Sequence, residues 1–328
     1  MTGADPLPAG APLRSRARAS SVPCVSVTLG PATQIVLSGG NSLVSGNSQT
    51  LTATIKDAAG NTVTSGTDST QSVNFTKAGG AGSLTGLGNP AAAGGVATVM
   101  VTGVTAGAVN VTAAATLTAG ATTSNTLVVT VTYGQATQIA LTGGAGLGVG
   151  ASQTLTATIQ DAAGNTVTGG TDSTVSVTFA KASGTGTLTG LAARTAVGGL
   201  APKNVTGSAV GTVNWIATAT LAQGTTTSNT LAISVNPAPT ITSPTVGSPV
   251  NPGQNGSTSF TLTGTNFQNG LTVTGRGSAG VTGFTWLTST SVSVNVTGSG
   301  VLGATGFFRV TNPDGGTVAS ASGSVKNG

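Results

Sequence analysis

The chain has 328 residues, only 5% of which are charged, and its formal net charge at pH 7 is +5. It contains no histidine, and all six of its acidic residues are aspartates. Histidine and glutamate are the usual general acids, general bases and metal ligands, so this composition argues against an enzyme. We therefore expect no catalytic residues and no cofactor.

The first 30 residues lack the apolar segment of a signal peptide, and we expect a disordered or non-native leader there. Three of the eleven cations, Arg14, Arg16 and Arg18, lie in this leader, and the other eight stand singly. A nucleic-acid partner needs clustered cations, so none is expected. No apolar run reaches the roughly 18 residues of a membrane-spanning helix, so membrane insertion is not expected either. Cys24 is the only cysteine, which rules out a disulfide within the chain.

The most informative feature is an internal repeat with an offset of 104 residues. The segment Ser48–Thr64 returns as Ser152–Thr168 with one difference over 17 positions, Lys56 against Gln160. A unit of about 100 residues is the size of one immunoglobulin-like sandwich. We therefore place unit 1 at residues 31–133, unit 2 at 135–236 and unit 3 at 238–326. Pro237 and Pro239 restrict the backbone between units 2 and 3, which favours an extended, semi-rigid array.

Both copies carry the alternation of β-strands. Leu51, Ala53 and Ile55 share one parity, and threonines fill the other. The segment 57–61 then supplies aspartate, glycine and asparagine, which are typical of turns. Trp215 stands where unit 1 has Val111, at a parity that predicts burial. The predicted fold class is all-β, with tandem immunoglobulin-like β-sandwiches in an extended array.

One stretch differs between the copies. Thr98, Val99 and Met100 of unit 1 become Pro202, Lys203 and Asn204 in unit 2. A proline within a strand predicts an edge, where it hinders aggregation by strand pairing. The alternative is a recognition patch that these residues form with Arg194.

Units 1 and 2 resemble bacterial immunoglobulin-like domains of the invasin/intimin (Big-1-like) type. The resemblance rests on residues 51–64, a Val-x-Phe strand, a glycine-rich loop, and residues 95–97 and 105–113 of unit 1. The proline that often follows Gly-Asn in that pattern is replaced by Thr62 and Thr166. The resemblance implies domains that carry adhesin tips away from a cell surface.

Unit 3 resembles IPT/TIG domains in residues 238–244, 260–270 and 310–316. These immunoglobulin-like modules occur in surface receptors, transcription factors and some secreted carbohydrate enzymes. Unit 3 also holds six of the ten aromatic residues of the chain. Phe308 shares the parity of Val310 and is expected in the core, whereas Phe307 shares the parity of Arg309. We therefore predict a ligand or partner site at Phe307 and Arg309, because exposed aromatic side chains beside polar groups can bind sugars or proteins.

Four aspartates are candidates for calcium binding with nearby carbonyl groups: Asp57, Asp68, Asp161 and Asp172. A calcium site usually gathers several oxygens, often from two or more carboxylates, and each unit offers only two. The leading prediction for metals is therefore that none is bound.

These features predict a non-catalytic spacer or stalk array on a bacterial surface or in a secreted protein, with an extracellular or cell-surface location. One alternative is an accessory module that binds a carbohydrate or protein through unit 3, with a host-surface protein or glycan as partner. Another is a phage virion protein decorated with immunoglobulin-like units.

Overall fold

The computed structural model describes residues 2–3, 28–253, 255–298 and 301–327. Within these residues the chain folds into strands and two short 3₁₀ helices, and the predicted all-β class of tandem immunoglobulin-like sandwiches is confirmed. The expectation of a leader over residues 1–30 falls largely outside the described residues. No helix in the described ranges is long and apolar enough to cross a membrane.

Unit 1 packs a sheet of order β1-β3-β6-β5 against a second sheet of order β2-β9-β7-β4, with β8 paired to β7. Its elements are β1 (Ala32–Ser38), β2 (Ser42–Val44), β3 (Ser48–Asp57), η1 (Thr67–Thr70), β4 (Asn74–Gly79), β5 (Leu84–Thr85), β6 (Val96–Gly103), β7 (Gly107–Leu117), β8 (Gly120–Thr123) and β9 (Leu127–Thr132).

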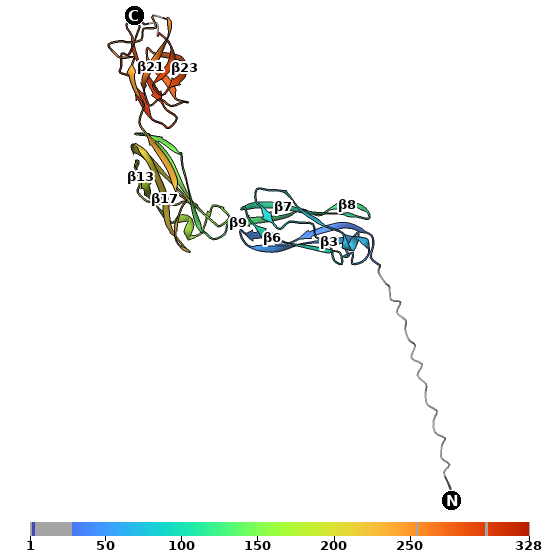
Figure 1. Ribbon diagram of the computed structural model, residues 1–328. Coiled ribbons are helices and arrows are strands. Elements are labelled where there is room, and N and C mark those ends of the chain that lie inside the picture. Colours follow the sequence, from blue (N-terminus) through green and yellow to red (C-terminus); the bar gives the residue numbers. More distant parts are fainter. Residues whose placement is uncertain (1, 4–27, 254, 299–300, 328) are drawn as a thin grey trace.

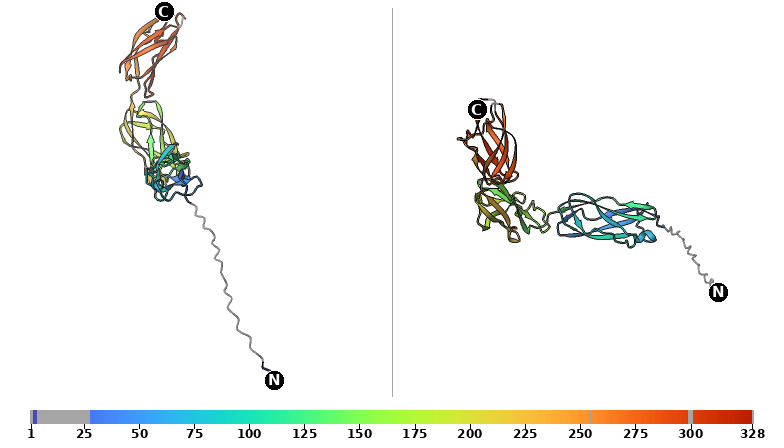
Figure 2. Two further views of the ribbon diagram at one scale, coloured as in Figure 1. Left: turned by 90° about the vertical axis from the view of Figure 1, so that its right-hand side faces the viewer. Right: turned by 45° about the horizontal axis from the view of Figure 1, so that its top comes forward.

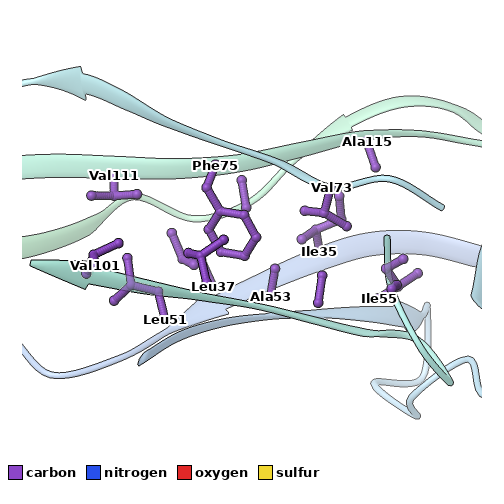
Figure 3. Close-up of a cluster of buried hydrophobic side chains, with 14 of the residues drawn as sticks. Ile35, Leu37, Leu51, Ala53, Ile55, Val73, Phe75, Val101, Val111 and Ala115 are labelled. Carbon is purple, nitrogen blue, oxygen red and sulfur yellow. The ribbon is translucent and has the colours of Figure 1, made fainter. Parts of the chain in front are cut away.

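The core of unit 1 follows from the strand alternation. Leu51, Ala53 and Ile55 of β3 are fully buried, and the intervening threonines are half-buried on the other face. Phe75 of β4 points between the sheets toward Leu37 of β1 (Figure 3). The two parities thus separate the core from the surface, as the pattern predicted.

Unit 2 repeats this architecture with sheets of order β10-β12-β16-β14 and β11-β19-β17-β13-β15, and β18 pairs with β17. Trp215 is 1% exposed in its core, which confirms the predicted burial. The elements are β10 (Gln138–Thr142), β11 (Gly146–Gly148), β12 (Ser152–Gln160), η2 (Thr171–Thr174), β13 (Ser176–Gly184), β14 (Thr187–Thr189), β15 (Arg194–Thr195), β16 (Leu200–Ala209), β17 (Gly211–Leu221), β18 (Gly224–Thr227) and β19 (Leu231–Asn236).

Pro202 lies in β16, and only part of this strand has a neighbouring strand on both sides. On one side β16 pairs with β12, and Pro202 stands opposite Thr156. On the other side β14 pairs only with the segment 206–209. Pro202 therefore occupies a locally open edge, where its missing N–H interrupts no ladder.

Unit 3 is a smaller sandwich with sheets of order β20-β21-β24-β23 and β22-β25-β26, and β27 pairs with β25. The rings of Phe260 and Phe308 lie 5.1 Å apart between centroids and tie the sheets together. The strands are β20 (Thr240–Ser243), β21 (Ser257–Thr265), β22 (Thr272–Gly277), β23 (Gly280–Thr288), β24 (Ser291–Thr297), β25 (Thr305–Thr311), β26 (Thr317–Ala319) and β27 (Val325–Lys326).

The three units lie end to end, each with its own hydrophobic core, and the array bends between units 1 and 2 (Figures 1 and 2). A single compact globule of this length would have a radius of gyration of about 20 Å. We expect small-angle scattering to give a clearly larger value, because the units contact each other only at their ends. A measured value at or near 20 Å would contradict the extended array.

Candidate functional site

The end of unit 2 that faces unit 1 is organised by one buried carboxylate. Asp161 follows β12 and accepts two backbone hydrogen bonds at Oδ1, from Ala163 and Asn165, both at 2.9 Å. Its Oδ2 accepts from the N–H of Gly134 at 2.8 Å and from Nδ2 of Asn165 at 2.9 Å. Since Gly134 belongs to the link between the units, this carboxylate fixes both the turn 161–165 and the entry of the chain into unit 2.

Asn165 carries the contact across to unit 1. Its Nδ2 donates to the carbonyl oxygen of Val104 at 2.7 Å and to the Ser45 hydroxyl at 3.0 Å. Its Oδ1 accepts from the N–H of Ala106 at 2.7 Å. The side chain is buried, with 9% of its surface exposed. One carboxamide therefore satisfies polar groups in two loops of unit 1, which defines the first joint of the array.

Unit 1 contains the same turn without the joint. Oδ1 of Asp57 accepts from the N–H groups of Ala59 at 3.0 Å and Asn61 at 2.8 Å. Its Oδ2 accepts from Gly30 N and Asn61 Nδ2, both at 3.1 Å. Asn61 is exposed and forms no hydrogen bond to another unit within the part of the chain that the structure describes. Each copy thus closes this turn with hydrogen bonds of its own, and the asparagine side chain lies at the end of the unit, where a neighbouring unit can contact it.

These hydrogen bonds hold both carboxylates in the ionised form. The side-chain amide of Asn61 is the main cause that lowers the pKa of Asp57, and the surrounding backbone N–H groups add to it. At Asp161 burial is the largest single effect and raises the pKa, but the donors from Gly134, Asn165 and Ser45 together outweigh it. The net direction is a lowered pKa at both sites.

The joint between units 2 and 3 uses a different aspartate. The backbone carbonyl of Asp314 accepts from Gly148 N at 2.9 Å, and its Oδ2 accepts from Nδ2 of Asn236 at 2.9 Å. Gln268 of unit 3 also donates to Oδ2. A Cβ atom on Gly148 would lie 2.6 Å from the Cα of Gly316, so this close approach requires glycine. Asp314 and Gly148 therefore define the second joint.

The calcium candidates are surrounded mainly by hydrogen-bond donors. Besides the two turn aspartates, Asp68 accepts from the N–H of Thr118 at 2.8 Å and from its hydroxyl at 2.9 Å, and Asp172 accepts from Ala222 N at 2.9 Å. Among the described residues no three His, Cys, Asp or Glu side chains gather as a metal site would. The contacts assign these four aspartates a structural role, and the prediction that no metal is bound is not tested by them.

The predicted partner site lies on β25 of unit 3. Phe308 is fully buried, whereas Phe307 is half-buried on the opposite face and stands across from Arg276 of β22. Arg309 is exposed on the same face, opposite Thr274. The structure thus brings Phe307 and Arg309 to one face outside the core. Binding there remains a prediction.

The joint residues are the functional positions that sequence reasoning missed. The sequence places Asn165 only in a turn, within the segment that is almost unchanged between the copies. Asp314 lies within residues 310–316, for which the sequence indicates only a resemblance to IPT/TIG domains. The usable signal was Asp161 followed by an asparagine four residues later, because that pair can close a turn and still present an amide outward.

No protein-family model and no curated protein matches the chain. Similar solved structures include the D00–D0 domain of intimin, at 17% identity with 61% of this chain and 98% of that chain covered and a TM-score of 0.33. The Escherichia coli adhesin FdeC is 18% identical over 90% of this chain and 99% of that chain, with a TM-score of 0.28. A marsupial T cell receptor is 12% identical over 90% and 99%, with a TM-score of 0.26. Such values bear on the sandwich fold alone and carry no argument about function.

Two neighbouring phenylalanines provide a test of the two faces of β25. Phe307→Ser should lower the free energy of unfolding of unit 3 by about 1 kcal/mol, because the side chain is only half-buried. Phe308→Ser should lower it by at least about 3 kcal/mol, because it removes a fully buried ring. Thermal and denaturant unfolding of the two variants measure the difference. Equal losses would show that Phe307 belongs to the core.

The lowered pKa values predict how acid affects the turns. A carboxylate whose pKa is lower in the folded state stabilises the fold above its unfolded pKa of about 3.9, and this stabilisation is lost as pH falls through the folded value. We expect the unfolding midpoint to decline below about pH 4. Asp161→Asn cannot titrate at this position and should decline less steeply between pH 5 and pH 2. Identical pH profiles would contradict the role of Asp161.

Proposed function

We propose that the chain is a non-catalytic spacer or stalk array of the bacterial immunoglobulin-like, invasin/intimin type, exposed on a bacterial surface or in a secreted protein. In this proposal units 1 and 2 are spacer domains, and unit 3 is an IPT/TIG-like module at the end of the array. The first joint is the observation that carries the proposal, because a stalk holds its end at a distance only if its joints resist bending.

Several contacts restrict the first joint. Asn165 engages groups of both units, and Asp161 holds the link through Gly134. The neighbouring link residue, Tyr133, is half-buried and packs against the core of unit 2. A single buried hydrogen bond contributes about 1 kcal/mol, but leaving its partners unsatisfied costs about 1–3 kcal/mol each. A bend that breaks the Asn165 contacts would leave these polar groups unsatisfied, and the bend would therefore cost this free energy.

A second candidate function is binding of a host-surface protein or glycan through unit 3. It is favoured by the exposed apolar side chains of β23, where Phe284 is 41% and Leu287 48% exposed. Aromatic side chains that remain exposed on a folded domain are frequent in binding sites. This role is compatible with a stalk, since the two functions would lie in different units.

The stalk proposal predicts that Asn165→Ala loosens the first joint. Spin labels can be attached at the exposed positions Thr116→Cys of unit 1 and Thr178→Cys of unit 2, after Cys24→Ser removes the native thiol. Pulsed electron resonance then gives the distribution of distances between the labels. We expect a narrow distribution for the unsubstituted joint and a clearly broader one for Asn165→Ala.

The repeat supplies the matched control. Asn61→Ala removes the same carboxamide from the same turn, but from the end of unit 1 where it contacts no other described unit. It should leave the distribution of distances unchanged and lower the stability of unit 1 only modestly. If Asn165→Ala gives no more broadening than Asn61→Ala, the Asn165 contacts do not stiffen the array and the stalk proposal loses its main support.

A further inference from the structure

Unit 2 has a pocket that lies away from both joints and from the predicted site in unit 3. It has a volume of about 390 Å³ and lies where β16 meets β15. We call it the β16 pocket and define it by its lining residues Thr154, Arg194, Pro202, Lys203 and Asn204.

The β16 pocket distinguishes the two copies. At the corresponding positions 104 residues earlier, unit 1 has Thr50, Pro90, Thr98, Val99 and Met100, none of which is charged. Both cations of the pocket, Arg194 and Lys203, are therefore additions relative to unit 1. They occur in a chain in which only 5% of the residues are charged, so their presence in one pocket needs a physical explanation.

Lys203 occupies a position that the fold would fill with an apolar side chain. It lies on the parity of Ala201 and Val205, both of which are buried, and the corresponding Val99 in unit 1 is only 8% exposed. Lys203 itself is half-buried. Replacing a buried valine by lysine gives up apolar burial and restricts a flexible charged chain, so the exchange lowers the stability of unit 2 in the absence of a ligand. A charge beside Pro202 also hinders pairing of this open edge with another strand.

The acidic side chains of unit 2 are engaged elsewhere. Asp161 lies seven residues beyond Thr154 along β12, which is about 23 Å in a strand. Its carboxylate accepts hydrogen bonds at the first joint, and Asp172 accepts from the N–H of Ala222. The carboxylate at the far end of β12 therefore cannot neutralise the two cations, since at that distance its charge is screened by salt.

Asn204 adds a third donor. The Thr154 hydroxyl donates to its Oδ1 at 2.7 Å, which occupies the acceptor end of the amide. The Nδ2 end donates no hydrogen bond to any of the described residues and is available as a donor. The lining of the β16 pocket thus includes two cationic residues and an amide N–H group. Asn204 lies on the exposed parity of β16 and Lys203 on the opposite one, so the long lysine side chain reaches the pocket around the open edge.

The open edge of β16 provides access to this set of donors. Since β14 pairs only with the segment 206–209, no strand extends the sheet beside Pro202, and Arg194 comes from the short strand β15 next to it. Arg194 is exposed, so its guanidinium can form the paired hydrogen bonds that carboxylate and sulfate groups accept.

From these donors we propose that the β16 pocket binds a carboxylate or sulfate group of an acidic polysaccharide. A protein partner is the less favoured occupant, because protein interfaces centre on apolar or aromatic anchors, and Pro202 is the only apolar residue of the lining. The proposal departs from the expectation that binding resides in unit 3. It does not depend on the stalk function.

The test uses the full chain and three oligosaccharides of equal length: an oligogalacturonate, a sulfated cello-oligosaccharide and the neutral cello-oligosaccharide. Amide NMR spectra are recorded during each titration at low salt. We expect the signals of the Asn204 side-chain amide and the Lys203 backbone to shift with at least one acidic oligosaccharide and not with the neutral one. The acidic oligosaccharide that binds more tightly identifies the preferred group.

Lys203→Val is the decisive variant, because unit 1 shows that valine is accommodated at this position. It should weaken binding of the acidic oligosaccharide about five- to tenfold, as expected for the loss of one charge-assisted contact. Lys56→Gln is the matched control. It removes one positive charge and installs the residue that unit 2 carries at position 160, and it should change the affinity less than twofold.

Four outcomes would overturn the proposal. They are equal binding by Lys203→Val and the unsubstituted chain, equal binding of the neutral oligosaccharide, shifts confined to unit 3, and tighter binding of a poly-aspartate peptide than of either acidic oligosaccharide.

Discussion

The array depends on how the Asp161 carboxylate is satisfied. Four hydrogen bonds from Ala163, Asn165 and Gly134 close the turn and fasten the link between units 1 and 2. Because Asp161 and the backbone complete the turn, the Asn165 carboxamide can reach into unit 1. A neutral side chain at position 161 would weaken the turn and the joint together, so the local fold and the arrangement of the units share one electrostatic cause.

The sequence predicted what depends on short-range pattern. The alternation around Leu51 identified the core face of β3, and the same reasoning placed Trp215 inside and Phe307 outside. The joint could not be predicted in this way, because Asn61 and Asn165 have nearly identical sequence surroundings and opposite exposures. Asn165 is buried because unit 1 covers it, whereas among the described residues no other unit covers Asn61. Strand periodicity and turn propensity do not predict which end of a domain contacts a neighbouring domain.

The two joints differ in the groups that units 1 and 2 offer at the end that faces the next unit. Unit 1 offers the Ser45 hydroxyl to Asn165, whereas the corresponding residue of unit 2 is Val149, which has no side-chain polar group to offer. Unit 3 therefore contacts unit 2 through other groups, namely the amide of Asn236 and the N–H of Gly148, both bound to Asp314. In both joints the C-terminal unit supplies the carboxylate, which is Asp161 of unit 2 in the first joint and Asp314 of unit 3 in the second.

The copies also show which positions the sandwich itself constrains. The block that forms β3 and the following turn is kept almost unchanged, because it supplies both the buried face and the carboxylate-closed turn. The sequence difference at β16 instead places Lys203 on a core-facing parity. A valine there, like Val99 at the corresponding position of unit 1, would make unit 2 more stable. Folding and joint formation give no reason for this exchange, since unit 1 does both with valine. Protection of the open edge is one reason for a charge beside Pro202, whereas the second cation, Arg194 of β15, is the observation that points beyond edge protection to a ligand of the β16 pocket.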